Sequence, residues 1–185
     1  TNTGATTLDP VVINDDLSKV LSSGKVTAEP KATFTGIEGD APKAKSDGDA
    51  ITWNGTLTVG QSVVVTYTVK LNKDAEGVIV NNHASSSATP PGLPPITPPD
   101  VETWHPTPGY TFNKTSDPAS GNSVQAGDVL TYTLTGSNFG KTVLDPVKIN
   151  DNLAEVLRYA GMKGEPKAVI VSEAGTVNAE SQPKL

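Results

Sequence analysis

Two pairs of adjacent acidic or amide side chains are the first candidates for chemistry in this sequence. Asp15-Asp16 and Asp151-Asn152 carry the oxygen atoms that Ca²⁺ prefers as ligands. A calcium site needs about six to eight such oxygens, and neither pair belongs to an Asp-x-Asp-x-Asp-Gly loop. The sequence therefore predicts no metal site and no cofactor.

Other reactive residue types are present without the spacing that their chemistry needs. His83 and His105 have no second ligand at metal-binding distance in the sequence, and the nucleophile motif Gly-x-Ser-x-Gly is absent. Trp53 and Trp104 could stack on sugars, but Trp53 lies in an expected strand and is better explained as a core residue. We therefore expect no enzyme activity beyond a self-catalysed reaction.

Alternation along the expected strands places an amine, an amide and a carboxyl group on inward faces. Lys114 shares a strand face with Tyr110 and Phe112. Asn82 shares one with Val78 and Val80, and Asp15 shares one with Val11 and Ile13. Burial favours the uncharged forms of an amine and of a carboxylic acid. A buried lysine would then be a nucleophile, and a buried aspartic acid would be a proton donor.

These residues lie in a chain that contains one segment twice. The sequence TNTGATTLDPVVINDDLSKVL, residues 1–21, recurs as SNFGKTVLDPVKINDNLAEVL, residues 137–157, and Glu-Pro-Lys-Ala recurs at 29–32 and 165–168. A period this long indicates tandem domains. The stretch 111–137 precedes the second copy and has no counterpart before Thr1, while 51–84 has no counterpart in the second copy. We therefore expect a first copy without its opening strands and a second copy without its closing strands within these 185 residues.

The local patterns are those of β-strands. Residues 62–71 and 129–135 are rich in β-branched and aromatic side chains, and the second stretch alternates apolar residues with threonine. Asn54-Gly55 predicts a tight turn. Helix is expected only as one or two turns at 16–21 and 152–157. Many short strands separated by turns predict an all-β fold, an immunoglobulin-like antiparallel sandwich.

We expect three parts in the chain: a first copy at 1–88, a linker at 89–108 and a second copy at 109–185. The linker contains three Pro-Pro pairs, which favour a semi-rigid polyproline spacer. The net charge of −6 and only 14 basic residues predict no nucleic-acid-binding face, and no apolar stretch is long enough to span a membrane.

The motifs together resemble a known family. The matching stretches are 112–121 (FNKTSDPASG), 124–134, the LDPVxINDxL segment, and the first-copy stretches 51–57, 63–71 and 77–84. They are similar to the tandem immunoglobulin-like repeats of Gram-positive surface adhesins and pilus-like stalks. The resemblance implies a structural stalk repeat at the bacterial cell surface, in a parent protein anchored to the cell wall. The alternative is a carbohydrate- or calcium-binding accessory module of a secreted enzyme.

The resemblance also implies an autocatalytic isopeptide bond. In such repeats a strand lysine attacks an asparagine amide with help from a buried carboxyl group, which matches Lys114, Asn82 and either Asp15 or Asp151. Asn81 is the second choice for the amide, because the Asn-x-Ala ending of the family fits Asn82. The simpler alternatives are a lysine that reaches solvent and an aspartate that caps the following helical turn.

The groups of the expected crosslink lie in different copies of the repeat, since Lys114 belongs to the second copy and Asn82 to the first. Strands 109–136 could complete the first copy within one chain, because a spacer of roughly 20 residues can extend about 60 Å. They could equally complete it in a neighbouring molecule by strand exchange. The expected partners are thus neighbouring repeats and a second copy of this chain.

Overall fold

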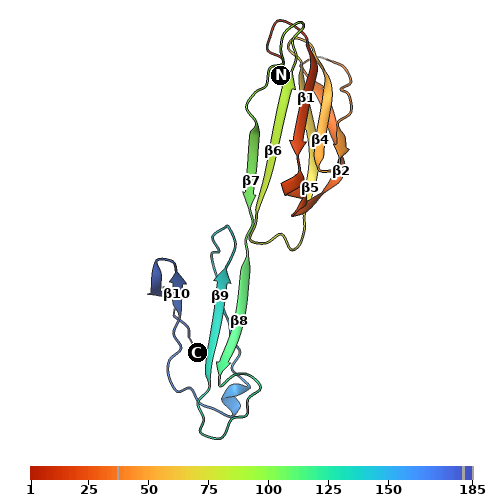
Figure 1. Ribbon diagram of the computed structural model, residues 1–185. Coiled ribbons are helices and arrows are strands. Elements are labelled where there is room, and N and C mark those ends of the chain that lie inside the picture. The colour runs from red at the N-terminus through yellow and green to blue at the C-terminus, as the bar shows by residue number, and fades with distance from the viewer. Residues whose placement is uncertain (37, 181, 185) are drawn as a thin grey trace. The chain divides into compact units, whose positions relative to one another are not determined.

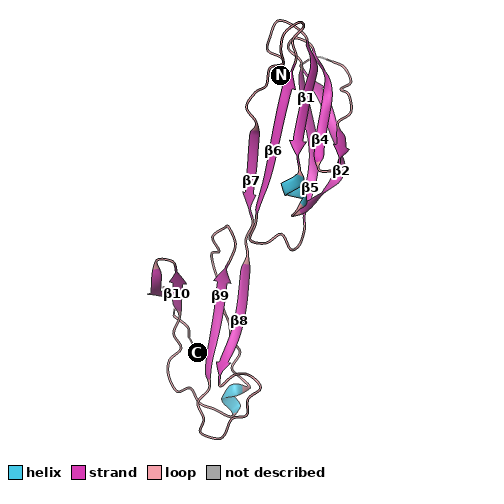
Figure 2. Cartoon of the chain, in the orientation of Figure 1, coloured by secondary structure: helices cyan, strands magenta, loops and turns pink. Residues whose placement is uncertain are grey.

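The computed structural model describes residues 1–36, 38–180 and 182–184, and nearly all of its regular structure is β-strand (Figure 2). The chain divides into two compact units, Thr1–Pro146 and Val147–Leu185. Every strand pair recorded is antiparallel. The prediction of an all-β antiparallel sandwich is confirmed.

The first copy has one large sheet and one small sheet. The large sheet has the order β3-β4-β1-β6-β7, formed by Lys45–Asp47, Ala50–Leu57, Leu8–Asp16, Ile79–Ala88 and Val101–Pro106 (Figure 1). The small sheet pairs β2, Gly24–Thr35, with β5, Ser62–Leu71. One helical turn, α1 at Ser18–Leu21, follows β1.

The core lies between these two sheets. One cluster gathers around Trp53 and Leu57 of β4, against which Phe34 of β2 and Val63 of β5 pack. A second cluster gathers around Ile51 and Val80, and takes in the inward side of β5. The inward residues of β5 alternate with exposed ones, so this strand has the single buried face that its sequence predicts.

One turn prediction is wrong. Asn54-Gly55 lies inside β4, where Gly55 pairs with Val11 of β1. The ring of Trp53 covers Gly55 so closely that a Cβ there would lie 2.5 Å from Cζ2 of the tryptophan. The glycine is therefore explained by a close approach of an aromatic ring and not by a turn.

The expected linker is partly a strand. Val101–Pro106 forms β7 on the edge of β6, and Ile96 makes an isolated bridge with Ala88. The chain stays bound past the end of β7, because Thr107 exchanges hydrogen bonds with Val78, and Gly77 N–H donates to the Pro108 carbonyl. The segment that connects the copies is thus shorter than the predicted 89–108.

The second copy begins with a hairpin, in which β8, Tyr110–Asp117, pairs with β9, Thr131–Asn138. Its next turn repeats a turn of the first copy. The side-chain amides of Asn2 and Asn138 each accept a hydrogen bond from the glycine two residues on and donate one to a threonine carbonyl four residues on.

The remaining regular structure of the second copy is sparse. A short 3₁₀ turn at Val156–Arg158 follows the repeated segment, and β10, Val169–Ser172, pairs with β11, Gly175–Asn178. The helical turns thus fall near both places where the sequence predicts them. Within the described residues, no helix combines the length and apolar character that a membrane crossing would need.

Candidate functional site

Three polar side chains from three strands meet between the two sheets of the first copy. The Tyr67 hydroxyl on β5 donates to Oδ2 of Asp15 on β1 at 2.7 Å. The amide Nδ2 of Asn82 on β6 donates to the Tyr67 oxygen at 2.9 Å. The tyrosine therefore connects a carboxyl group with an amide across the interior of the sandwich.

Strand alternation explains this meeting. Asp15 shares its face of β1 with Val11 and Ile13, and Asn82 shares its face of β6 with Val80. On the opposite sheet, Tyr67 lies on the inward face of β5, between Val65 and Val69. The local turn is made by the next residue: Oδ1 of Asp16 accepts the Ser18 N–H at 2.9 Å, and no side chain caps α1, whose N-cap is Leu17.

Two oxygen atoms of this cluster are buried acceptors with no donor. Oδ1 of Asp15 and Oδ1 of Asn82 are shielded from solvent, and neither accepts a hydrogen bond from any described residue. A buried polar atom without a partner costs about 1–3 kcal/mol. The cluster is therefore a hydrogen-bonding site that lacks donors.

The environment of Tyr67 favours its neutral form. Burial, reinforced by the hydrogen bond to Asp15 and by the negative charge of that carboxyl group, raises the pKa of Tyr67 to about 12. The hydrogen bond from Asn82 acts in the opposite direction and is the smaller effect. The hydroxyl is thus kept protonated as a donor to Asp15.

This raised pKa predicts a loss of stability in alkali. Below about pH 10 the phenol is protonated in both the folded and the unfolded chain, so its contribution is complete. Between about pH 10 and 12 the unfolded chain releases the proton first, and the free energy of unfolding falls. We expect a loss of about 1 kcal/mol, because partial solvent access reduces the effect of the full shift.

Urea unfolding at several pH values checks this, with Tyr67→Phe as the reference variant. The wild-type protein should lose more stability than Tyr67→Phe between about pH 10 and 12. Equal losses in both proteins would show that Tyr67 titrates alike in the folded and unfolded states.

Asn81, the second candidate for the amide, has a different setting. Its Nδ2 donates to Oε1 of Glu102 on β7, and its position on β6 is opposite in parity to that of Asn82. Its Oδ1 is also a buried acceptor without a described partner. Because Asn82 and not Asn81 reaches Tyr67, the cluster contains the first-choice asparagine.

The structure does not bring Lys114 into this cluster. Lys114 is exposed on β8, opposite Leu134 of β9, and its Nζ lies 4.8 Å from the ring centroid of Tyr132. Asp151, the counterpart of Asp15, is half-buried in the unit Val147–Leu185 and lies outside any strand. Of the predicted site residues, Asp15 and Asn82 are therefore brought together through Tyr67.

Tyr67 is the residue that sequence reasoning missed. Its inward parity with Val65 and Val69 could be read from the strand pattern, because all three fall on one face of residues 62–71. The pattern marks such a tyrosine as core, and nothing in it indicates that its hydroxyl meets Asp15 and Asn82 across the sheets.

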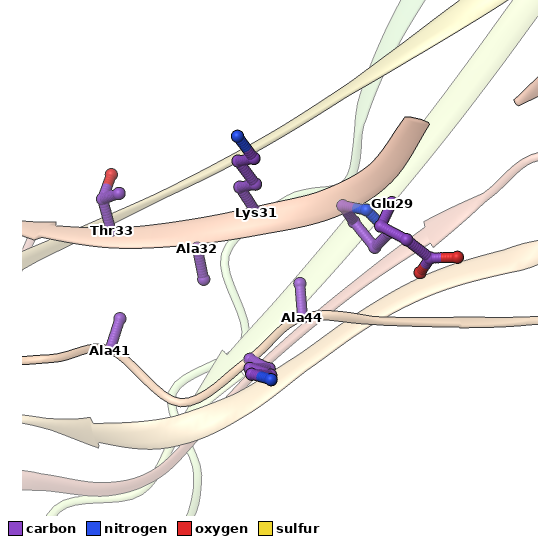
Figure 3. A pocket seen from close by; sticks show the side chains of 8 residues that line it. Glu29, Lys31, Ala32, Thr33, Ala41 and Ala44 are labelled. Carbon is purple, nitrogen blue, oxygen red and sulfur yellow. The ribbon is translucent and has the colours of Figure 1, made fainter. Parts of the chain in front are cut away.

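No other region of the described chain has comparable chemistry. A hollow between β2 and residues 41–44 is lined by Glu29, Pro30, Lys31, Ala32, Thr33, Ala41, Lys43 and Ala44, and Lys31 and Thr33 point to the side of β2 opposite Ala32 (Figure 3). Among the described residues, no three histidine, aspartate or glutamate side chains are grouped so that they could hold a metal ion.

The fold and the cluster define the class of the protein as an all-β antiparallel sandwich repeat with a half-buried Asp-Tyr-Asn cluster between its sheets. The chain belongs to the family described as a domain of unknown function (DUF7927), which matches residues 1–107 and again residues 109–183. No curated protein and no solved structure shows a significant match. The first match includes β7, in agreement with its place in the first sheet.

Proposed function

We propose that the chain is a structural stalk repeat of an extracellular bacterial cell-surface protein, stabilised by a Lys–Asn isopeptide bond. The bond would join a lysine to Asn82, with Asp15 as the acid that assists the reaction. The chain would act on no external substrate, and its partners would be neighbouring repeats. Two tandem matches to one family support a repeat, and the sequence motifs that resemble surface stalk repeats support this role.

The observation that carries the proposal is the pair of donorless acceptors around Tyr67. A lysine amine that enters the cluster can donate to Oδ1 of Asp15 and lie beside the amide carbon of Asn82. Oδ1 of Asn82, in turn, can accept a hydrogen bond from the Asp15 carboxyl group when that carboxyl group carries a proton. Both unsatisfied acceptors are thus explained by one additional amine and one proton.

The proposed reaction balances without a co-reactant. The neutral lysine Nζ attacks Cγ of Asn82, and the negative charge that develops on Oδ1 is stabilised by the proton of Asp15. The Cγ–Nδ2 bond then breaks, a proton from Nζ passes to the leaving nitrogen, and ammonia departs. Tyr67 holds Nδ2 and the second carboxyl oxygen in place, so it acts as a positioning residue.

We assign Lys114 to the reaction because of its position in the repeat. It lies on β8, the first strand of the second copy, and Asp151 of that copy is the counterpart of Asp15. The order of groups along one whole repeat is then lysine, aspartate, tyrosine and asparagine. Each copy here contains only part of that set.

Intact mass of the full chain under denaturing conditions tests the proposal. Each crosslink should lower the summed mass of the joined chains by one ammonia. Lys114→Arg should restore the full mass, because a guanidinium stays protonated and is not a nucleophile. Asn82→Ala should do the same, whereas Asn81→Ala, on the other face of β6, should leave the crosslink intact.

Full mass in a folded wild-type sample would contradict the crosslink, as would loss of ammonia that persists in Asn82→Ala. Asp15→Ala is expected to stop the reaction if the first copy supplies the acid. An effect of Asp151→Ala alone would instead assign that role to the second copy.

A further inference from the structure

The connection between the two copies is short and buried. Residues 107–109 join the end of β7 to the start of β8, and both sides of this connection belong to the unit Thr1–Pro146. Thr107 and Gly109 are buried, although connections between domains ordinarily run through exposed and mobile segments. The burial indicates that other parts of the chain pack against this connection.

The first copy holds the connection through the residues before β6. Thr107 N–H donates to the Val78 carbonyl at 2.8 Å, and Gly77 N–H donates to the Pro108 carbonyl at 2.9 Å. The Thr107 hydroxyl also accepts the Val78 N–H and donates to the Val78 carbonyl. The connection thus continues the pairing of β6 with β7 beyond the end of β7.

The second copy holds the same connection through the loop after β9. The N–H groups of Phe139 and Gly140 both donate to the Gly109 carbonyl, at 3.1 and 3.2 Å. Lys141 N–H donates to the Thr107 carbonyl at 3.1 Å. All three carbonyl groups of residues 107–109 are therefore hydrogen-bonded, and the bonds come from both copies.

The ring of Phe139 lies over two glycines at this place. A Cβ at Gly77 would lie 2.7 Å from Cδ2 of Phe139, and a Cβ at Gly109 would lie 2.7 Å from its Cε2. Such distances are too short for a real Cβ, so the ring occupies space that only glycine leaves free. One side chain of the second copy thus contacts both the first copy and the connection.

The first copy shows that the turn itself does not need this ring. Phe139 corresponds to Thr3, and the same side-chain turn is made by Asn2 in the first copy and by Asn138 in the second. A threonine is therefore compatible with the turn. The phenylalanine is explained instead by its contact with Gly77 and Gly109.

We propose that residues 77–78, 107–109 and 139–141 form a stiff joint between consecutive repeats, which the ring of Phe139 closes. The partner that fits residues 77–78 and 107–109 is thus the loop after β9 of the next repeat in the same chain. The joint limits bending between the copies, because the backbone that connects them is bonded to both. It does not rest on the proposed isopeptide bond, since no residue of the Asp-Tyr-Asn cluster takes part.

Amide hydrogen exchange of the full chain tests the joint. The amides of Gly77 and Lys141 should exchange slowly, because each donates to a carbonyl of the connection from a different copy. Phe139→Thr should accelerate both about fivefold to tenfold, since a ring that is 45% exposed contributes part of the burial energy of a phenylalanine. The amides inside β8 and β9 should keep their rates.

Phe112→Thr is the matched control. Phe112 is 50% exposed and lies on β8, outside the joint, so the same substitution there should leave the exchange of Gly77 and Lys141 unchanged. Equal acceleration by the two substitutions would overturn the role of the Phe139 ring. Exchange of Gly77 and Lys141 at the rates of an unstructured peptide in the wild-type protein would overturn the joint as a whole.

Gly109→Ala gives an independent check of the ring contact. The three atoms nearest to a Cβ at Gly109 all belong to the Phe139 ring. The substitution should therefore accelerate the same exchange in the wild-type background and have little effect in the Phe139→Thr background. Equal effects in both backgrounds would mean that the ring does not lie over Gly109.

Spin labels measure the stiffness directly. The chain contains no cysteine, so Thr66→Cys on β5 and Thr133→Cys on β9, both at exposed positions, provide two unique attachment sites. Double electron–electron resonance should give one narrow distance distribution, which Phe139→Thr broadens and Phe112→Thr does not. A broad distribution without Phe139→Thr would contradict a stiff joint. All these proteins should carry Lys114→Arg, so that the outcome is independent of whether the proposed crosslink forms.

Discussion

Replacing Trp53 by alanine should lower the free energy of unfolding of the first copy by about 3–5 kcal/mol, the usual loss when a large core aromatic is removed. Trp53 is 1% exposed and its ring meets that of Phe34 edge to face, with centroids 6.2 Å apart. Its Nε1 also donates to the Pro42 carbonyl at 2.9 Å, so the variant leaves a cavity and an unpaired acceptor.

Urea unfolding followed by circular dichroism measures this loss. Trp104→Ala is the matched control, because Trp104 on β7 is 63% exposed and should change stability by less than about 0.5 kcal/mol. Similar effects of the two substitutions would contradict the position of Trp53 in the core. They would also weaken the assignment of β4 as a central strand.

The strands that could be predicted from sequence are those with a clear single buried face. The bounds of β5 coincide with the period-2 stretch 62–71, and Trp53 was correctly expected in the core. The turn prediction at Asn54-Gly55 was wrong because the dipeptide alone does not distinguish a tight turn from a glycine inside a strand. Only the ring of Trp53, which lies over the glycine, distinguishes the two.

The repeated segment shows why local pattern alone was insufficient. LDPVVINDD in the first copy forms β1, which is paired on both sides by β4 and β6. The corresponding residues 144–152 in the second copy form no strand. Since the two sequences are nearly the same, the difference lies in their neighbours: β1 pairs with β4 and β6, whereas no described strand pairs with residues 144–152.

The candidate site was predictable in part for the same reason. Parity along β1 and β6 correctly placed Asp15 and Asn82 on inward faces. The connection between them depends on which residues of two separate sheets lie opposite one another, and single-strand periodicity carries no such information. Tyr67 was therefore missed, although its strand was predicted to the residue.

Removing the Tyr67 hydroxyl should destabilise the first copy by about 1–3 kcal/mol. In Tyr67→Phe, Oδ2 of Asp15 loses its donor and Nδ2 of Asn82 loses its acceptor. The carboxyl group then has both oxygens without a described partner, because Oδ1 already has none. The cost thus comes mainly from the buried acidic group that remains.

A double-mutant cycle identifies this cause. Asp15→Ala should cost less in the Tyr67→Phe background than in the wild-type background, with a coupling of about 0.5–3 kcal/mol between the two residues. All four proteins should carry Lys114→Arg, so that differences in crosslinking do not enter the comparison. Tyr159→Phe, at a tyrosine that is 88% exposed, is the control for loss of a phenol hydroxyl and should be neutral. Additive costs for Asp15 and Tyr67 would mean that the hydrogen bond between them contributes nothing to folding. Tyr67 could then not position Asn82 for the proposed reaction, because the same bond fixes the tyrosine that contacts the Asn82 amide.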